Sequence, residues 1–157
     1  MGFQNPSDYI LTKDIVSDVY IIHNLSLFTC EVALAEVLML QGIKPDLITG
    51  HSFGEFAALV ASGIVPFEQM LELIYYRDVW CPKPFEIGQM LAVNANEPAI
   101  KKLLKGQKYY ISNINSPKQT VISVQNGDIE SIKSFLNKNS IRFRQLDIPQ
   151  PYHTGLL

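Results

Sequence analysis

Apolar positions recur at helical spacing through much of the first half of the chain. Residues 25–41 are apolar on nearly every side, which predicts a helix buried against a sheet. The short apolar run at residues 45–49 predicts a buried strand. Two more helices are expected at residues 53–62 and 67–79, and Pro66 is expected at the first position of the second one.

The pattern changes in the second half, where short apolar stretches alternate with amphipathic ones. Strands are predicted at residues 90–95, 108–114, 119–124 and 141–148. Helices are predicted between them, at residues 97–105 and 128–137. The resulting order β-α-β-β-α-β is that of a ferredoxin-like unit.

The turn between the expected strand at 45–49 and the following helix carries Gly50-His51-Ser52-Phe53-Gly54, a G-x-S-x-G pattern. In a nucleophile elbow a strand turns sharply into a helix, and the serine occupies a strained position at the turn. Glycines two residues to either side keep Cβ atoms out of such a turn, and the helix start places positive charge beside the hydroxyl. Ser52 is therefore the candidate nucleophile.

Composition and charge exclude several classes of function. The chain has 157 residues and a net charge of −2 without a basic stripe, so nucleic acid is not an expected partner. No apolar run reaches the roughly 18 residues of a membrane span, and no signal peptide is visible, so we expect no membrane partner and a cytoplasmic location. Cys30 and Cys81 lack partners at metal-ligand spacing, which predicts free thiols and no metal site.

A serine nucleophile needs a general base, and the chain has three histidines. His51 adjoins Ser52, but neighbouring side chains on a sharp turn usually point apart. His23 precedes the helix expected at 25–41 and is assigned to packing or to the surface. His153 follows the last expected strand on a proline-bounded loop. From the residues alone it is either a solvated loop histidine or a catalytic partner brought in by the fold.

Arg77 stands in the apolar and aromatic segment expected as the helix at 67–79. It is either a surface charge whose stem lies along the core, or a guanidinium that binds a substrate carboxylate through two parallel hydrogen bonds. Composition does not decide between the two.

Several short motifs follow one another in order along the chain. They are Gly42-Ile43-Lys44-Pro45-Asp46, the elbow with Ala57-Ala58 and Ser62-Gly63, Gly88-Gln89-Met90-Leu91-Ala92-Val93, Asn115-Ser116-Pro117-Lys118-Gln119-Thr120-Val121-Ile122-Ser123 and Tyr152-His153-Thr154. Together they resemble the acyltransferase family typified by malonyl-CoA:acyl carrier protein transacylase, which includes acyltransferase domains of polyketide and fatty acid synthases. The resemblance spans residues 21–157.

The resemblance implies an α/β fold with two parts. One is a partial α/β-hydrolase-like lobe that carries the nucleophile elbow, and the other is an inserted ferredoxin-like βαββαβ small subdomain. Residues 1–87 are then part of the large lobe, residues 88–149 form the small subdomain, and residues 150–157 return to the large lobe.

The resemblance also implies an activity, the transfer of a malonyl-type extender unit from CoA to the phosphopantetheine thiol of an acyl carrier protein, in fatty acid or polyketide biosynthesis. Ser52 is then the nucleophile with His153 as its base. The backbone N–H of Phe53 holds the oxyanion, and Arg77 binds the carboxylate of the extender. Further residues expected along the substrate pocket are His51, Tyr152 and Asn115.

The expected partners are malonyl-CoA or a related acyl-CoA, the carrier protein, and other domains of a synthase. No permanently bound cofactor is expected, because the acyl-CoA is a substrate and the phosphopantetheine belongs to the carrier protein.

The chain departs from the family pattern mainly at its ends. The family's N-terminal G-x-G-x-Q-like segment has no match in residues 1–20, and family members continue well past the catalytic histidine. We therefore expect the chain to be truncated at both ends and weakly active or inactive by itself. Within the matched region, Asn24 stands where the family usually has glutamine, Val124 replaces a glycine and Gly155 replaces a common proline.

Two alternative functions fit the same residues. One is a proofreading hydrolase of the same fold that removes stalled acyl chains from carrier proteins. Arg77 argues against it, because a plain acyl chain has no carboxylate to bind. The other is a catalytically incomplete fragment that serves as a docking or structural module of a synthase. The identity of the extender unit stays open.

Overall fold

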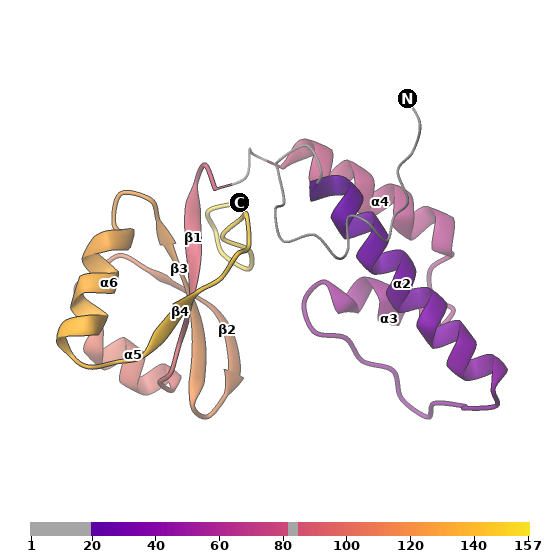
Figure 1. Ribbon diagram of the computed structural model, residues 1–157, viewed down its shortest axis with the longest axis horizontal. Coiled ribbons are helices and arrows are strands. Elements are labelled where there is room, and N and C mark those ends of the chain that lie inside the picture. The colour runs from indigo at the N-terminus through magenta and orange to yellow at the C-terminus, as the bar shows by residue number, and fades with distance from the viewer. Residues whose placement is uncertain (1–19, 82–84) are drawn as a thin grey trace. The chain divides into compact units, whose positions relative to one another are not determined.

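The computed structural model describes residues 20–81 and 85–157. They fall into two compact units, Met1–Cys81 and Pro82–Leu157 (Figure 1). The helices of the first unit are α2 (Tyr20–Leu40), α3 (Gly54–Ala61) and α4 (Phe67–Trp80). The elements of the second unit are β1 (Gly88–Val93), α5 (Glu97–Leu103), β2 (Tyr110–Ser116), β3 (Gln119–Gln125), α6 (Ile129–Lys138) and β4 (Phe143–Gln145).

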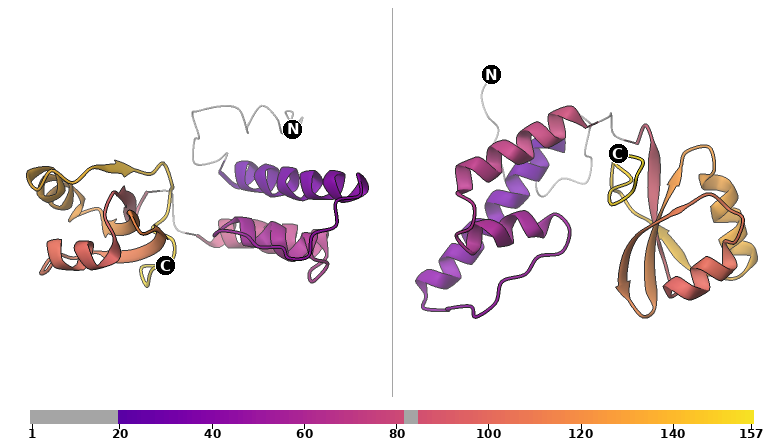
Figure 2. Two further views of the ribbon diagram at one scale, coloured as in Figure 1. Left: turned by 90° about the horizontal axis from the view of Figure 1, so that it is seen from below. Right: turned by 180° about the vertical axis from the view of Figure 1, so that it is seen from behind.

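The first unit has two layers, with α2 lying across α3 and α4 (Figure 2). The buried side chains between the layers are Phe28, Val32, Met70 and Ile74. The rings of Phe28 and Phe67 stack with their centroids 5.4 Å apart, which joins α2 to the start of α4. Phe53 and Phe56 pack against the same cluster, so the segment around Ser52 is fixed to this core.

The first helix differs from its prediction in extent and in surroundings. It begins at Tyr20, so His23 lies within the helix and not ahead of it. The expectation of burial against a sheet is wrong for the described part of this unit, where α2 packs on α3 and α4. Leu34 and Leu40 are exposed. A helix that is apolar on every side does not reveal from its sequence which side is buried. Here the contacts with α3 and α4 determine the buried side.

The same helix bears on the expectation that no segment could span a membrane. With 21 residues and few charges, α2 has the length and composition of a membrane-crossing helix. The core helix of a globular domain passes the same test, and α2 supplies Phe28 and Val32 to a packed core. Length and composition therefore do not decide whether α2 is a membrane-crossing helix or a core helix. The absence of a membrane partner stays a prediction.

Residues 45–49 do not form the predicted strand. Leu47 in this segment is 82% exposed, and the described part of the first unit contains no strand beside it. A strand is defined by the hydrogen bonds that its backbone makes to a neighbour, so an apolar run without a neighbour does not become one.

The helices at 53–62 and 67–79 are confirmed, with one change at the second. Pro66 is the N-cap residue of α4, with a ψ of 145°, and not its first helical residue. The φ that the proline ring fixes near −65° suits either position.

The second unit is a sheet of four strands in the order β2-β3-β1-β4, with antiparallel neighbours throughout. Together with the chain order β1-α5-β2-β3-α6-β4, this is the ferredoxin-like arrangement, and it confirms the predicted order of elements. The last strand is shorter than predicted and ends at Gln145, although the N–H of Leu146 still donates to the carbonyl of Met90 on β1 at 2.9 Å.

The sheet of the second unit is covered on both faces. Helices α5 and α6 lie on one face, where the buried cluster is Leu91, Val93, Ile100, Leu104, Ile122, Val124, Ile129, Ile132 and Leu136. The C-terminal segment lies on the other face, where Leu146, Ile148 and Tyr152 pack against Met90, Ala92 and Val121. Pro149 is also tied to the start of the unit, because its carbonyl accepts a hydrogen bond from the N–H of Phe85 at 2.6 Å.

Gly88, at the start of β1, lies where two backbones approach closely. A Cβ at this position would stand 2.5 Å from the carbonyl oxygen of Val124 on β3. The glycine of the Gly88-Gln89-Met90 motif is thus required by strand packing.

The two isoleucines at positions 122 and 114 offer a matched test of this core. Ile122 is 0% exposed on β3, whereas Ile114 is 56% exposed on β2. Ile122→Ala should lower the free energy of unfolding by about 2–5 kcal/mol, because it leaves a cavity. Ile114→Ala should change it by less than about 0.5 kcal/mol. Urea denaturation followed by circular dichroism measures both, and equal effects would contradict the assigned core.

Candidate active site

Ser52 stands at a sharp turn that leads directly into α3. Its φ of 54° is in the left-handed region, which costs a non-glycine residue energy. Tight hydrogen bonds close the turn, from the N–H of Gly54 to the carbonyl of His51 at 3.0 Å and from the N–H of Glu55 to the carbonyl of Ser52 at 3.1 Å. This is the strained serine that the G-x-S-x-G pattern predicts, although the segment before it is not a strand.

The two glycines of the pattern have different roles. A Cβ on Gly50 would lie 2.3 Å from the carbonyl carbon and oxygen of Gly54, so the chain can only turn here if residue 50 has no side chain. A Cβ on Gly54 would meet nothing within 4 Å. The prediction that both glycines keep Cβ atoms out of the turn therefore holds for Gly50 and is wrong for Gly54.

Phe53 directly follows Ser52 and is the N-cap residue of α3, with φ −59° and ψ −35°. The N–H groups at the start of a helix lie outside its internal hydrogen-bond ladder and give that end a partial positive charge. The backbone N–H of Phe53 is thus part of a local environment that favours a negative oxygen. Its role in holding an oxyanion stays a prediction.

Arg77 on α4 lies beside this turn. The guanidinium carbon is 5.2 Å from the ring centroid of Phe53 and 5.4 Å from that of Phe56. The face of an aromatic ring attracts a cation, which favours this position. The side chain of Arg77 is 27% exposed and borders a hollow of about 490 Å³ along α4, so a solute can reach it.

Asp78 holds the guanidinium from the other side. Its Oδ1 accepts hydrogen bonds from Nε of Arg77 at 2.8 Å and from Nη2 at 2.5 Å. Its Oδ2 accepts one from Nδ2 of Asn24 on α2, at 2.7 Å. The side chain of Asp78 is only 1% exposed. Sequence analysis missed this network, although a carboxylate next to an arginine in an apolar helix was a visible signal.

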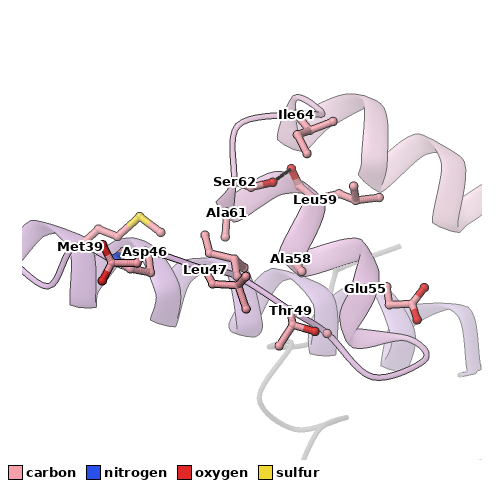
Figure 3. A pocket seen from close by; sticks show the side chains of 13 residues that line it. Met39, Asp46, Leu47, Thr49, Glu55, Ala58, Leu59, Ala61, Ser62 and Ile64 are labelled. Carbon is pink, nitrogen blue, oxygen red and sulfur yellow. Dashed lines mark hydrogen bonds between the residues drawn. The ribbon is translucent and has the colours of Figure 1, made fainter.

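The other predicted residues of the first unit contribute less. His51 is exposed on the turn itself. A separate hollow of about 540 Å³ lies beside α3. It is bordered by Leu47 and Thr49 of the preceding segment and by Ala58 and Leu59 of the helix (Figure 3). Its lining is mainly apolar and contains none of the predicted site residues.

The remaining predicted residues lie in the second unit. His153 is exposed and has a φ of 61°, and the neighbouring Thr154 donates its hydroxyl to the carbonyl of Pro151 at 2.6 Å. Tyr152 packs on the sheet face that carries Met90. Asn115 is exposed at the β2–β3 hairpin, where its Nδ2 donates to Oε1 of Gln119 at 3.0 Å.

The structure thus groups Ser52, Phe53 and Arg77 within one unit, and Tyr152 and His153 within the other. The pairing of Ser52 with His153 stays a prediction. The described residues contain no group of three His, Cys, Asp or Glu side chains placed to hold a metal ion.

Comparison with known proteins identifies the family of the chain. The family model described as "Acyl transferase domain" matches residues 7–154. The non-reducing polyketide synthase nscA of Aspergillus fumigatus is 33% identical over 143 residues, 86% of this chain and 8% of that protein. The non-reducing polyketide synthase gsfA of Penicillium aethiopicum is 34% identical over 135 residues, 84% of this chain and 8% of that protein.

Solved structures share the fold. A malonyl CoA-acyl carrier protein transacylase from Clostridium perfringens has a TM-score of 0.78 at 23% identity, over 95% of this chain and 50% of that one. A malonyl-transacylase solved in complex with its type II polyketide synthase acyl-carrier protein has a TM-score of 0.75 at 26% identity, over 96% of this chain and 55% of that one.

The mixed α/β architecture with an antiparallel sheet is a fold that the chain shares with these solved structures. The match over residues 7–154 is decisive, and the chain belongs to the acyl transferase domain family. It spans 8% of the length of the two polyketide synthases and about half the length of the two transacylase chains.

Substitution of the two glycines by alanine tests the geometry of the turn. Gly50→Ala should destabilise the chain by at least about 1–3 kcal/mol, because the new methyl group meets backbone that cannot move aside. Gly54→Ala should leave stability equal or slightly higher, since the position is open and alanine favours the helix. Thermal melting followed by circular dichroism gives the comparison. Similar melting of both variants would refute the assigned close approach.

The two cysteines should differ in reactivity. Burial raises the pKa of the Cys81 thiol, Arg77 opposes this and Asp78 adds to it, whereas Cys30 is exposed. A raised pKa leaves less thiolate near pH 8, so iodoacetamide should label Cys81 more slowly than Cys30, and the difference should shrink as pH rises. Peptide mass spectrometry measures both rates. Equal rates in the native chain, and not only in urea, would contradict this.

Proposed function

We propose that this chain is part of an acyltransferase that takes a malonyl-type extender unit from CoA and passes it to the phosphopantetheine thiol of an acyl carrier protein, in fatty acid or polyketide biosynthesis. The observation that carries the proposal is the position of Arg77, whose guanidinium lies over the ring of Phe53, the residue after the strained Ser52. A nucleophile beside a fixed cation suits an acyl group that ends in a carboxylate.

The proposed first half-reaction acylates the serine. His153 takes the hydroxyl proton of Ser52 while the serine oxygen attacks the thioester carbonyl of the acyl-CoA. The tetrahedral oxyanion is stabilised by the N–H of Phe53. The carbon–sulfur bond then breaks, and the CoA sulfur leaves with the proton that His153 returns.

The second half-reaction is the reverse with a different thiol. The phosphopantetheine thiol of the carrier protein gives its proton to His153, and its sulfur attacks the acyl-serine. The serine oxygen leaves and regains the proton, so neither a redox partner nor a bound cofactor is consumed. A metal or permanently bound cofactor is therefore not part of the proposal.

Arg77 is proposed to select the acyl group. A guanidinium and a carboxylate form paired, charge-assisted hydrogen bonds, which an acetyl group cannot form. His51, Tyr152 and Asn115 are proposed to line the pocket around the acyl chain. The same clamp disfavours a hydrolase for plain acyl chains.

The proposed partners follow from this chemistry. Two solved relatives lend support, one in complex with an acyl-carrier protein and one an acyltransferase domain in complex with 2-(pent-4-yn-1-yl)malonyl. The polyketide synthase relatives support neighbouring synthase domains as further partners. We propose a cytoplasmic location, where acyl-CoA is made and used.

The nucleophile is tested by following the mass of the chain after mixing with malonyl-CoA. The wild type should gain one malonyl group on Ser52, and hydroxylamine, which cleaves serine esters, should remove it. Ser52→Ala should gain nothing. His153→Ala should acylate at least about 100-fold more slowly, because general base catalysis typically contributes that factor. Malonylation at another residue, or equal labelling of Ser52→Ala, would overturn the assignment.

The carboxylate clamp is tested by selectivity. Arg77→Ala should lower the ratio of malonyl-CoA to acetyl-CoA acylation rates by roughly 10–100-fold, the effect of a charged hydrogen-bonded pair worth about 1.5–3 kcal/mol. Arg77→Lys keeps the charge but lacks the planar fork, and should fall between wild type and Arg77→Ala. An unchanged ratio in Arg77→Ala would exclude the clamp.

A further inference from the structure

The buried carboxylate of Asp78 contacts Arg77 and is not used by the proposed mechanism. Both of its oxygens are engaged, Oδ1 by Nε and Nη2 of Arg77 and Oδ2 by Nδ2 of Asn24. The two residues that donate these hydrogen bonds, Arg77 and Asn24, come from different helices, α4 and α2. Asp78 therefore links the guanidinium to the core of the first unit.

The pairing of Arg77 with the next residue is unusual for a helix. Adjacent residues on a helix do not ordinarily face each other, so this contact depends on the length of the arginine side chain, whose Nε and Nη2 reach Oδ1 of Asp78. The carboxylate binds the side of the guanidinium that carries Nε and Nη2. A substrate carboxylate would be bound at the end formed by the two terminal nitrogens, Nη1 and Nη2.

The guanidinium also lies against two aromatic rings. Its carbon is 5.2 Å from the ring centroid of Phe53 and 5.4 Å from that of Phe56, so these rings restrict its movement as well. A hydrogen-bonded edge and two aromatic contacts together determine both the location and the orientation of the group. A long flexible arginine loses rotamer entropy when it is fixed, and the network supplies that ordering before a ligand arrives.

We propose that Asp78 is the positioning residue for Arg77, and that Asn24 holds Asp78 in place. Selectivity for a carboxylated acyl group then depends on the trio Asn24, Asp78 and Arg77. The part that concerns selectivity rests on the proposed acyltransferase function, whereas the positioning of the guanidinium can be measured without any substrate.

The competing explanation is that the ion pair between Arg77 and Asp78 only stabilises the fold and does not position the guanidinium. Two variants of Asp78 distinguish between these explanations. Asp78→Asn keeps an oxygen that can accept from Arg77 while the charge is lost. Its new amide nitrogen then faces Asn24, whose own amide can rotate to present oxygen. Asp78→Ala removes both the charge and the acceptor. Glu68→Gln, on the exposed first turn of α4 and outside the hollow that Arg77 borders, is the matched control.

Selectivity is measured as the ratio of Ser52 acylation rates with malonyl-CoA and acetyl-CoA. Asp78→Ala should lower the ratio about tenfold, and Asp78→Asn should keep it within about threefold of wild type. The loss should come from a higher KM for malonyl-CoA, because the clamp holds a group that does not react. Glu68→Gln should leave the ratio unchanged.

Positioning is measured by nuclear magnetic resonance, through exchange of the Arg77 Nε–H with water. The signal, assigned by its loss in Arg77→Lys, should exchange slowly in the wild type and in Asp78→Asn and rapidly in Asp78→Ala. Equal exchange in all three would overturn the inference. If Arg77→Ala leaves the malonyl to acetyl ratio unchanged, the proposed clamp fails, and this exchange measurement still decides whether Asp78 positions Arg77.

Discussion

The close approach of residue 50 to the first turn of α3 is the constraint on which the first unit depends. The backbone of Gly50 passes so near that of Gly54 that a methyl group would not fit. The same turn holds Ser52 in its left-handed conformation and leads into the helix at Phe53. Since Phe53 also packs on the core and under Arg77, one backbone contact determines the relation between the serine and the guanidinium.

The second constraint is electrostatic and concerns the buried carboxylate of Asp78. A carboxylate that is 1% exposed is costly unless every oxygen has a partner, and Asp78 meets this condition through Arg77 and Asn24. Asn24 is the position at which the family resemblance led us to expect glutamine. The shorter asparagine side chain reaches Asp78 at 2.7 Å, so this departure from the family pattern has a structural partner in the same chain.

Sequence reasoning succeeded where the determining forces are local. The amphipathic pattern of α6 and the short apolar stretches of β1 and β3 predicted the order of elements in the second unit. It failed at residues 45–49, because strand formation depends on a neighbour that periodicity does not reveal. It also missed Asp78, whose partner Asn24 is 54 positions away along the chain. The family motifs indicated Ser52, Arg77 and His153 but carried no information about what holds them.

The C-terminal segment of the second unit has a consequence for how the family can vary. Tyr152, beside His153, packs on the sheet face formed by Met90, Ala92 and Val121, while the alternate residues of the same strands lie under α5 and α6. Side-chain volumes on one face must therefore fit the two helices, whereas those on the other face must fit the C-terminal segment. Among relatives, positions 90, 92 and 121 should covary with position 152, independently of the helix-covered core.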